Sequence, residues 1–160
     1  MGILERITKN VDNKYWYPEN DTFPVKNRYT AGVAGQKFFQ ELKDNGKIYG
    51  TTCAACKLTF VPAKLFCEQC FAELDDWVDV GTTGILWSWT IAYKNKDDSK
   101  KETPTLLAAI RLADGLLVHW LGECSPEDVE IGMPVTAVFK DPGEREGSLL
   151  DIGHFKPVIS

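Results

Sequence analysis

Two Cys-x-x-Cys pairs are the residues of this chain whose spacing points most directly to chemistry. Cys53 and Cys56 form the first pair, Cys67 and Cys70 form the second, and ten residues separate them. Each pair places two thiolates on one tight turn, so four sulfurs can surround one ion tetrahedrally once the intervening segment folds back. The spacing therefore predicts a metal site. Free core thiols or a redox pair are the alternatives, although a redox pair needs only one Cys-x-x-Cys motif.

The predicted ion has a structural rather than a catalytic role. Four protein ligands fill the coordination sphere, whereas catalytic zinc keeps one position open for water or substrate. Structural Zn²⁺ is the expected cofactor. Iron would accept the same four sulfurs and would make the chain an electron carrier, and a visible absorption band in the purified protein would distinguish the two metals.

No residue outside the four-cysteine motif forms a convincing catalytic group. Cys124 lies beside Glu123 and near Asp128, and acidic neighbours oppose activation of a thiol. His119 lies within the apolar "LLVHWL" segment and His154 near the C-terminal strand, so both are expected to be structural. Because a Gly-rich phosphate loop and a suitably spaced carboxylate pair are also missing from the sequence, we expect no catalytic residue in the chain on its own.

Composition narrows the classes of protein further. The 160 residues include 18 Lys and Arg against 23 Asp and Glu, a net charge of −5, so the chain has no basic excess to suit a nucleic-acid backbone. The most apolar stretch is interrupted by Arg111 and Asp114, and the N-terminus lacks a secretory apolar run. We therefore expect a cytoplasmic protein without a membrane span, in whose reducing environment cysteines serve as metal ligands rather than as disulfides.

The segment before the cysteines divides into two parts. Residues 1–30 are predicted to form an extended arm, because Pro18 and Pro24 exclude a continuous helix, and its aromatic residues suit packing either on the domain or on a partner. Residues 31–46 are predicted to form an amphipathic helix. Its apolar stripe, spaced every fourth residue, is either core or a docking face.

The cysteine unit occupies residues 47–76, and the pattern of residues 77–160 is that of a β domain with five strands. Its first long strand, "TGILWSWTIAY", alternates in a way that predicts Trp87, Trp89 and Tyr93 on one face. An Asp-Gly turn signal separates two further strands as a hairpin. The charged segment "KNKDDSKKETP" between the first two strands is predicted to be a loop.

This order of elements resembles the DUF35 family. The matching pieces are "GVAGQKFFQELKDNGKIYGTTCAAC", "FVPAKLFCEQC", Trp77 and Val78 followed by Gly81, and "IGMPV". The resemblance implies a mainly β fold with an N-terminal helix, in which a rubredoxin-like zinc ribbon precedes a five-stranded OB-fold barrel. The family often has Gly after the second cysteine of each pair, where this chain has Lys57 and Phe71.

What the resemblance implies for function is a non-catalytic accessory subunit of an acyl-CoA enzyme. Such a subunit docks on a thiolase-like or hydroxymethylglutaryl-CoA (HMG-CoA) synthase-like enzyme in a hetero-oligomer. The "YTAGVAGQKFF" segment resembles small subunits of thiolases that cleave aromatic β-ketoacyl-CoA thioesters such as benzoylsuccinyl-CoA. Six residues are the expected contacts with the partner or with the phosphates of CoA: Trp16, Phe38, Phe39, Lys94, Lys96 and Lys100.

A second hypothesis comes from a different class, an OB-fold protein that binds single-stranded nucleic acid. Aromatic side chains on such a barrel can stack on bases. The acidic balance of the chain argues against this hypothesis, because such grooves need a positive track along the backbone. A salt-titrated binding assay with single-stranded oligonucleotides separates the two hypotheses.

Overall fold

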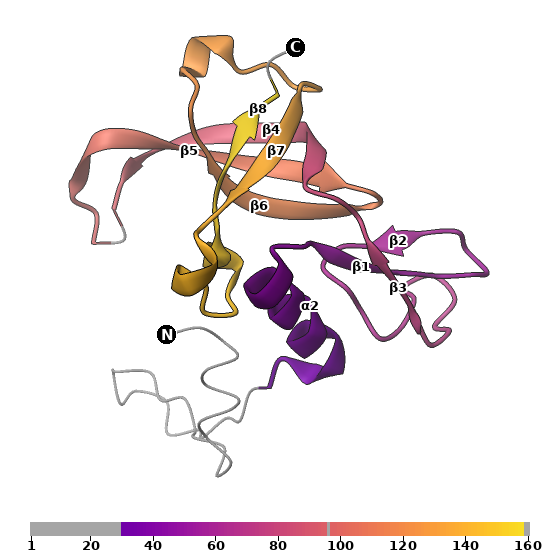
Figure 1. Ribbon diagram of the computed structural model, residues 1–160. Helices are drawn as coiled ribbons and strands as arrows, with labels where there is room; N and C mark the ends of the chain where they lie inside the picture. Colours follow the sequence, from indigo (N-terminus) through magenta and orange to yellow (C-terminus); the bar gives the residue numbers. More distant parts are fainter. Residues whose placement is uncertain (1–29, 96, 159–160) are drawn as a thin grey trace, which may run out of the picture.

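The structure is a computed structural model that describes residues 30–95 and 97–158. Within these residues it is mainly β with one α-helix, as the sequence predicts, and it has a small sheet beside a closed barrel (Figure 1). The predicted N-terminal arm, except for Thr30, lies outside the described residues, as do Trp16 and Lys96. None of the described helices is both long and apolar enough to cross a membrane.

Helix α2 (Gly32–Asn45) confirms the predicted amphipathic helix. It ends at Gly46, whose φ of 60° is left-handed and whose N–H donates to the carbonyl of Leu42 at 3.2 Å. The predicted partner contact at Phe38 is corrected by the structure. Phe38 is only 1% exposed and belongs to the main core, because the apolar stripe of the helix faces the barrel. Phe38 therefore has no surface to offer a partner.

The ribbon sheet has three antiparallel strands in the order β2-β1-β3. Thr51 in its central strand pairs with Phe60 on one side and Trp77 on the other. Strand β3 spans the start of the β domain predicted from residue 77, yet it is hydrogen-bonded into the ribbon, and the chain crosses to the barrel after it. The strands are β1 (Tyr49–Thr52), β2 (Thr59–Phe60) and β3 (Asp76–Asp79).

The barrel closes in the order β4-β5-β6-β8-β7, the five-stranded arrangement typical of an OB fold. All its strand pairs are antiparallel except β6 with β8, where Leu121 faces Phe155. Its strands are β4 (Thr83–Lys94), β5 (Lys100–Leu112), β6 (Gly115–Leu121), β7 (Pro134–Phe139) and β8 (Ile152–Pro157). Short 3₁₀ turns lie between strands: η1 (Pro126–Asp128), η2 (Pro142–Glu144) and η3 (Leu149–Asp151).

A β-bulge in β4 overturns the prediction that its aromatic residues share one face. The register with β5 slips by one residue at Trp87, which inverts the alternation from that point on. Trp87 is consequently 52% exposed on the outside of the barrel, beneath the guanidinium of Arg111 at 5.1 Å. Trp89 and Ile91, beyond the bulge, pack against the core instead.

The predicted charged loop between the first two barrel strands is shorter than expected. Strand β5 already begins at Lys100, which pairs with Lys94, so most of the charged segment is hairpin rather than loop. In Figure 1 this hairpin projects from the barrel on the side away from the ribbon.

The Asp-Gly turn between β5 and β6 forms the predicted hairpin and also fastens the ribbon to the barrel. The backbone N–H of Thr59 donates to a carboxylate oxygen of Asp114 at 2.8 Å, and the N–H of Asp114 donates to the carbonyl of Thr59 at 3.2 Å. Gly115 lies so close to Val61 that an added Cβ would stand 2.2 Å from its carbonyl oxygen. Only glycine fits this contact.

One hydrophobic core joins all three parts of the chain. It unites Phe38 and Leu42 of α2 and Val61 of the ribbon with residues of every barrel strand, such as Ile110 and Phe155. On the ribbon side, the ammonium of Lys37 lies 4.3 Å from the ring of Trp77. The helix is therefore a joint between ribbon and barrel.

Candidate metal centre

The four cysteines lie on two matching turns of the ribbon. In the first, the N–H of Lys57 donates to the carbonyl of Cys53 at 2.8 Å, and in the second the N–H of Phe71 donates to that of Cys67 at 3.0 Å. Both turns bring a backbone N–H within 3.4 Å of the first sulfur of the pair. The sequence makes each turn from the same Cys-x-x-Cys pattern, although the N–H that reaches the first sulfur comes from Cys56 in one turn and from Gln69 in the other.

The sulfur arrangement fits one tetrahedral ion. All four Sγ atoms lie within 4.8 Å of one another, and those of Cys53 and Cys70 are 3.6 Å apart. A Zn–S bond of about 2.3 Å in a tetrahedron puts neighbouring sulfurs roughly 3.8 Å apart. The structure thus brings together the four residues that the spacing nominated, and their all-thiolate donor set fits a structural metal ion, with zinc as the expected ion and iron as the alternative.

The electrostatics of the turns show why a cation belongs there. The backbone N–H groups of Cys70 and Gln69 lower the pKa of Cys67 to about 7. The pKa of Cys56 changes in the opposite direction, because hydrogen bonding with Cys70 raises it to about 12. Four thiolates this close repel one another, and a bound divalent cation would offset that electrostatic repulsion.

The ribbon has little core of its own beyond the sulfurs. Apart from Cys53 and Cys67, its buried cluster contains only Phe60 and Leu74. Thr51, fully buried, adds a polar clamp: its hydroxyl accepts from the N–H of Lys64 and donates to the carbonyl of the same residue, both at 2.9 Å. A bound ion would supply most of the folding free energy of this unit.

His119 is held as a neutral, structural imidazole. Its Nδ1 accepts the backbone N–H of Trp120 at 2.9 Å, so the proton sits on Nε2 and is donated to the carbonyl of Leu149 at 3.1 Å. Burial lowers the pKa of His119, which favours this neutral form. Both ring nitrogens are thus engaged by the backbone.

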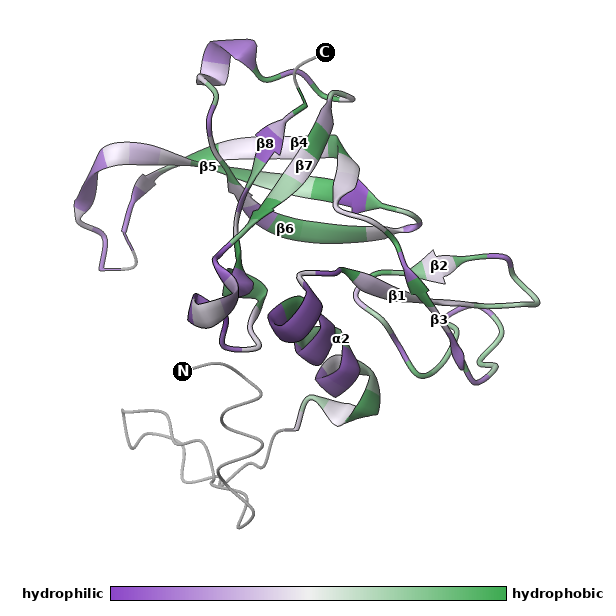
Figure 2. Ribbon diagram, in the orientation of Figure 1, coloured by the Kyte–Doolittle hydropathy of each residue, from purple (hydrophilic) through white to green (hydrophobic). Residues whose placement is uncertain are grey.

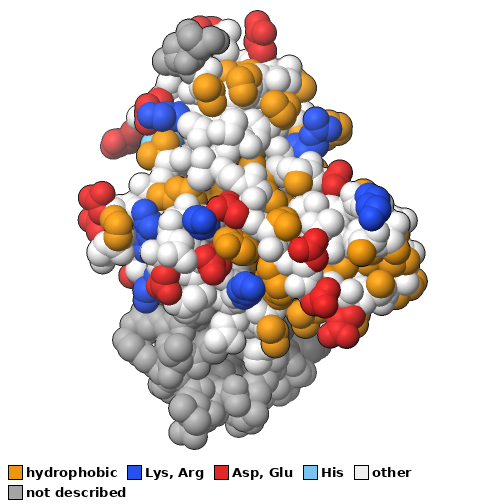
Figure 3. All heavy atoms as spheres, turned by 45° about the vertical axis from the view of Figure 1, so that its right-hand side comes forward, with side chains coloured by type: hydrophobic (Ala, Val, Ile, Leu, Met, Phe, Trp, Pro, Cys, Tyr) orange, Lys and Arg blue, Asp and Glu red, His pale blue; other side chains and the backbone are white. Residues whose placement is uncertain are grey.

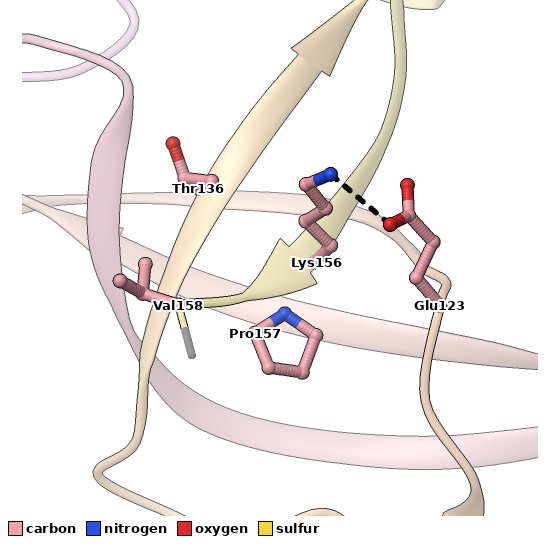
Figure 4. Close-up of a pocket in the computed structure, with 5 residues that line it drawn as sticks. All are labelled: Glu123, Thr136, Lys156, Pro157 and Val158. Atoms are coloured by element: carbon pink, nitrogen blue, oxygen red, sulfur yellow. Dashed lines mark hydrogen bonds and ion pairs between the residues drawn. The ribbon is translucent and has the colours of Figure 1, made fainter. Parts of the chain in front are cut away.

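His154 belongs to a surface ion cluster. Glu123 contacts Nε2 of His154 and Nζ of Lys156, each at 3.0 Å, and the hydrogen bond from Lys156 is the main reason that the pKa of Glu123 is lowered. Figure 4 shows Glu123 and Lys156 facing each other in a shallow pocket with Thr136, Pro157 and Val158. The pocket's cation and carboxylate neutralise each other, which leaves little charge to act on a substrate.

Cys124, the fifth cysteine, is partly buried against the core. Burial raises the pKa of its thiol, and the carboxylate of Asp128 raises it further. The protonated thiol is a poor nucleophile.

The remaining predicted contact residues are spread over the molecule. Phe39 is partly buried on α2, with its ring edge-on to that of Phe38. Lys94 and Lys100 face each other at the distal end of the β4–β5 hairpin, far from the helix (Figure 1). The structure therefore does not unite the aromatic and basic candidates in one site.

Sequence reasoning offered Trp87 as part of a hydrophobic surface but missed the β6 residues of an apolar face on the outside of the barrel. It is defined here as the barrel face and consists of Trp87, Leu116, Val118 and Trp120, all exposed. Val118 pairs with Ala109 and Trp120 with Leu107, so the face continues across β5 (Figure 2 shows β6 apolar along most of its length). The available signal was "LLVHWL", in which nearly every position is apolar although a surface strand usually alternates.

The fold and the cysteine cage define a zinc-ribbon protein with an appended OB-fold barrel. Residues 41–75 match the family model of the ChsH2 rubredoxin-like zinc ribbon domain, and residues 77–140 match that of the ChsH2 C-terminal OB-fold domain. A solved DUF35-family protein of unknown function from Sulfolobus solfataricus is 31% identical, with a TM-score of 0.56 over 67% of this chain and 78% of that one. The chain belongs to the DUF35 family.

Other relatives carry functional names of their own. A DUF35 domain-containing scaffold protein of Methanocaldococcus jannaschii is 26% identical over 75% of this chain and 88% of its own length. A probable enoyl-CoA hydratase alpha subunit of Thermomonospora curvata is 31% identical, over 61% of this chain but only 31% of that protein. A chain of the solved Ltp2-ChsH2(DUF35) aldolase is 24% identical, with a TM-score of 0.59. The match covers 82% of this chain and 100% of that chain, and it shows a shared fold.

Proposed function

We infer that this chain is a zinc-braced, non-catalytic scaffold subunit that docks on a thiolase-superfamily acyl-CoA enzyme. The observation that carries the proposal is the barrel face, whose large apolar side chains stand exposed on adjoining strands. Exposed apolar side chains gathered on one face mark interaction surfaces. The family resemblance supplies the thiolase class of the partner, and the names of relatives support a scaffold role beside an enzyme, because one is a scaffold protein and another is solved as an Ltp2-ChsH2(DUF35) aldolase.

The chemistry of the described groups suits a supporting role. The cage uses four protein ligands, His119 is locked by backbone hydrogen bonds, and Cys124 is a protonated thiol. Bond making would then belong to the partner, which supplies its own nucleophile and acid-base groups.

The proposal is tested by affinity capture of the full chain from its native extract. Mass spectrometry should identify a thiolase-superfamily enzyme, and the captured complex should show CoA-dependent thiolysis that the isolated chain lacks. Val118→Glu should reduce capture at least tenfold, because it places a charge at the centre of the barrel face. Ile131→Glu is the matched control, since Ile131 is 69% exposed and Val118 is 64% exposed. Thioester turnover by the chain alone would overturn the proposal.

The substrate that we propose for the partner is an aromatic β-ketoacyl-CoA such as benzoylsuccinyl-CoA. The support is the resemblance of the segment that begins α2 to small subunits of such thiolases. The captured complex should cleave benzoylsuccinyl-CoA with a higher kcat/KM than acetoacetyl-CoA. The reverse preference would remove this substrate and leave the scaffold role intact.

Lys94 and Lys100 remain the proposed contacts for the phosphates of CoA. They are directly opposed across the β4–β5 hairpin, an arrangement of like charges that disfavours the free protein and that a polyanion would relieve. Asp98, 3.5 Å from Lys94, offsets part of the charge. Lys94→Gln with Lys100→Gln should raise the KM for CoA in the complex several-fold without changing capture of the partner.

The barrel face also bears on the nucleic-acid hypothesis. It is built from apolar side chains, and its basic neighbour Arg111 is stacked on Trp87. Affinity for single-stranded oligonucleotides should therefore be weak at physiological salt. Tight, salt-sensitive binding would favour the nucleic-acid role.

A further inference from the structure

In both cysteine turns, the residue that follows the second cysteine has a left-handed backbone conformation. Lys57 and Phe71, the residues that follow each pair, have φ values of 61° and 59°. The left-handed region suits glycine and disfavours side chains with a Cβ. A flexible Lys fits this position better than a bulky aromatic ring, so Phe71 holds an unfavourable conformation.

Packing within the chain does not explain that aromatic ring. Phe71 is 79% exposed, the highest value among the large apolar side chains that the structure describes as exposed. Phe66, just before the second cysteine pair, is 58% exposed. A side chain that is exposed on a strained backbone adds no packing energy to the free protein. Residues with such strained backbone conformations concentrate at functional contacts.

The chain is acidic after the second cysteine pair, and Lys64, just before that pair, is ion-paired with Glu68. The sequence from Leu65 to Tyr93 contains no Lys or Arg, while Glu73, Asp75 and Asp76 are exposed in it. A zinc ion held by four thiolates would leave the cage itself with a charge of about −2. Figure 3 brings the ribbon side forward and shows apolar and acidic side chains next to one another there, with a basic side chain nearby.

We propose that the second cysteine turn, with Phe71 and Phe66 as apolar anchors and an acidic border, inserts into an apolar pocket edged by Lys or Arg on the thiolase-type partner. The inference rests on the proposed function and adds a second, electrostatically specified contact to the barrel face. Aromatic anchors of this kind carry much of the energy of an interface, and complementary charge sets the rate of association.

The test compares Phe71→Gly with Lys57→Gly in the full chain, using the thiolase-superfamily enzyme captured by the wild-type protein as the probe. Both substitutions relieve the same left-handed strain, so both should leave Tm unchanged or raise it by a few degrees. Equal zinc content of all three proteins shows that the cage is intact. Phe71→Gly should weaken binding of the enzyme at least tenfold, and Lys57→Gly should change it less than twofold.

A second variant examines the acidic border. Glu73→Lys with Asp75→Lys should slow association several-fold and reduce its dependence on ionic strength. If Phe71→Gly binds as the wild type does, or if Lys57→Gly weakens binding equally, the turn is not an anchor and the scaffold role stands. If the wild-type chain captures no thiolase-superfamily enzyme, the proposed function and this inference fail together.

Discussion

The cysteine that best reports on the metal site is Cys67, because it is buried and its sulfur also accepts the N–H of Gln69. Replacing one thiolate leaves three ligands and weakens zinc binding, which contributes on the order of 10 kcal/mol in small zinc peptides. We expect Cys67→Ser to lose most of its zinc and to unfold the ribbon, as measured by metal analysis and by amide exchange over residues 50–75. Cys124→Ser is the control. Full metal content in Cys67→Ser would contradict the four-ligand assignment.

His119 predicts a loss of stability in mild acid. Burial lowers its pKa in the folded protein, so below about pH 6.5 the unfolded chain binds a proton that the folded chain refuses. The stability that the neutral His119 contributes is therefore complete above the pKa of histidine in the unfolded chain. It is lost as the pH falls from that value to the lower pKa of His119 in the folded protein. His119→Gln can still donate to Leu149 without titrating, and should flatten that part of the stability curve measured by urea unfolding. His154→Gln serves as the control, and an unchanged slope in His119→Gln would reject this account.

At the residue scale, the sequence was sufficient where spacing alone decides geometry. The four cysteines are local pairs, so their turns could be predicted without knowledge of the rest of the fold. Phe38 could not be assigned in this way, because an apolar helical stripe looks the same whether a barrel or a partner covers it. Only the tertiary packing distinguishes the two outcomes.

At the scale of the elements, the contact between the β5–β6 hairpin and the ribbon gives a specific prediction about stability. Gly115→Ala would place a Cβ 2.2 Å from the carbonyl oxygen of Val61, which the backbone can accommodate only by moving the ribbon away from the barrel. We expect a loss of about 1–3 kcal/mol in the free energy of unfolding. Gly143→Ala, where an added Cβ would meet nothing within 4 Å, should be nearly neutral. Equal stability of the two variants in chemical denaturation would show that the contact is dispensable.

Element types were predictable from periodicity and turn residues, whereas details set by pairing were not. The helix, the Asp-Gly hairpin and the five-strand barrel follow from local pattern and resemblance. The bulge at Trp87 depends on how β4 pairs with β5, and no residue in "TGILWSWTIAY" announces it. The same limit applies to β3, whose partner is β1 of the ribbon rather than a barrel strand.

For the whole molecule, removal of zinc should separate the behaviour of ribbon and barrel. The ribbon's own cluster is small, while the barrel contributes most of the main core. A strong chelator should therefore abolish amide protection around the cysteine turns, lower Tm and leave protection in β5 and β6. Restoring Zn²⁺ should restore both. Complete unfolding of the barrel on chelation would show that the two parts form one cooperative unit.

The core that Phe38 and Leu42 share with Ile152 and Phe155 has a consequence for the order in which the protein matures. The helix is synthesised before any barrel strand, and β8, which completes the core around it, is synthesised after the other barrel strands. A helix of 14 residues is marginal in water by itself. During translation the apolar stripe of α2 therefore stays partly exposed until β8 has been synthesised and the barrel can close against it. A nascent chain that stops before Ile152 would present that stripe to chaperones or proteases.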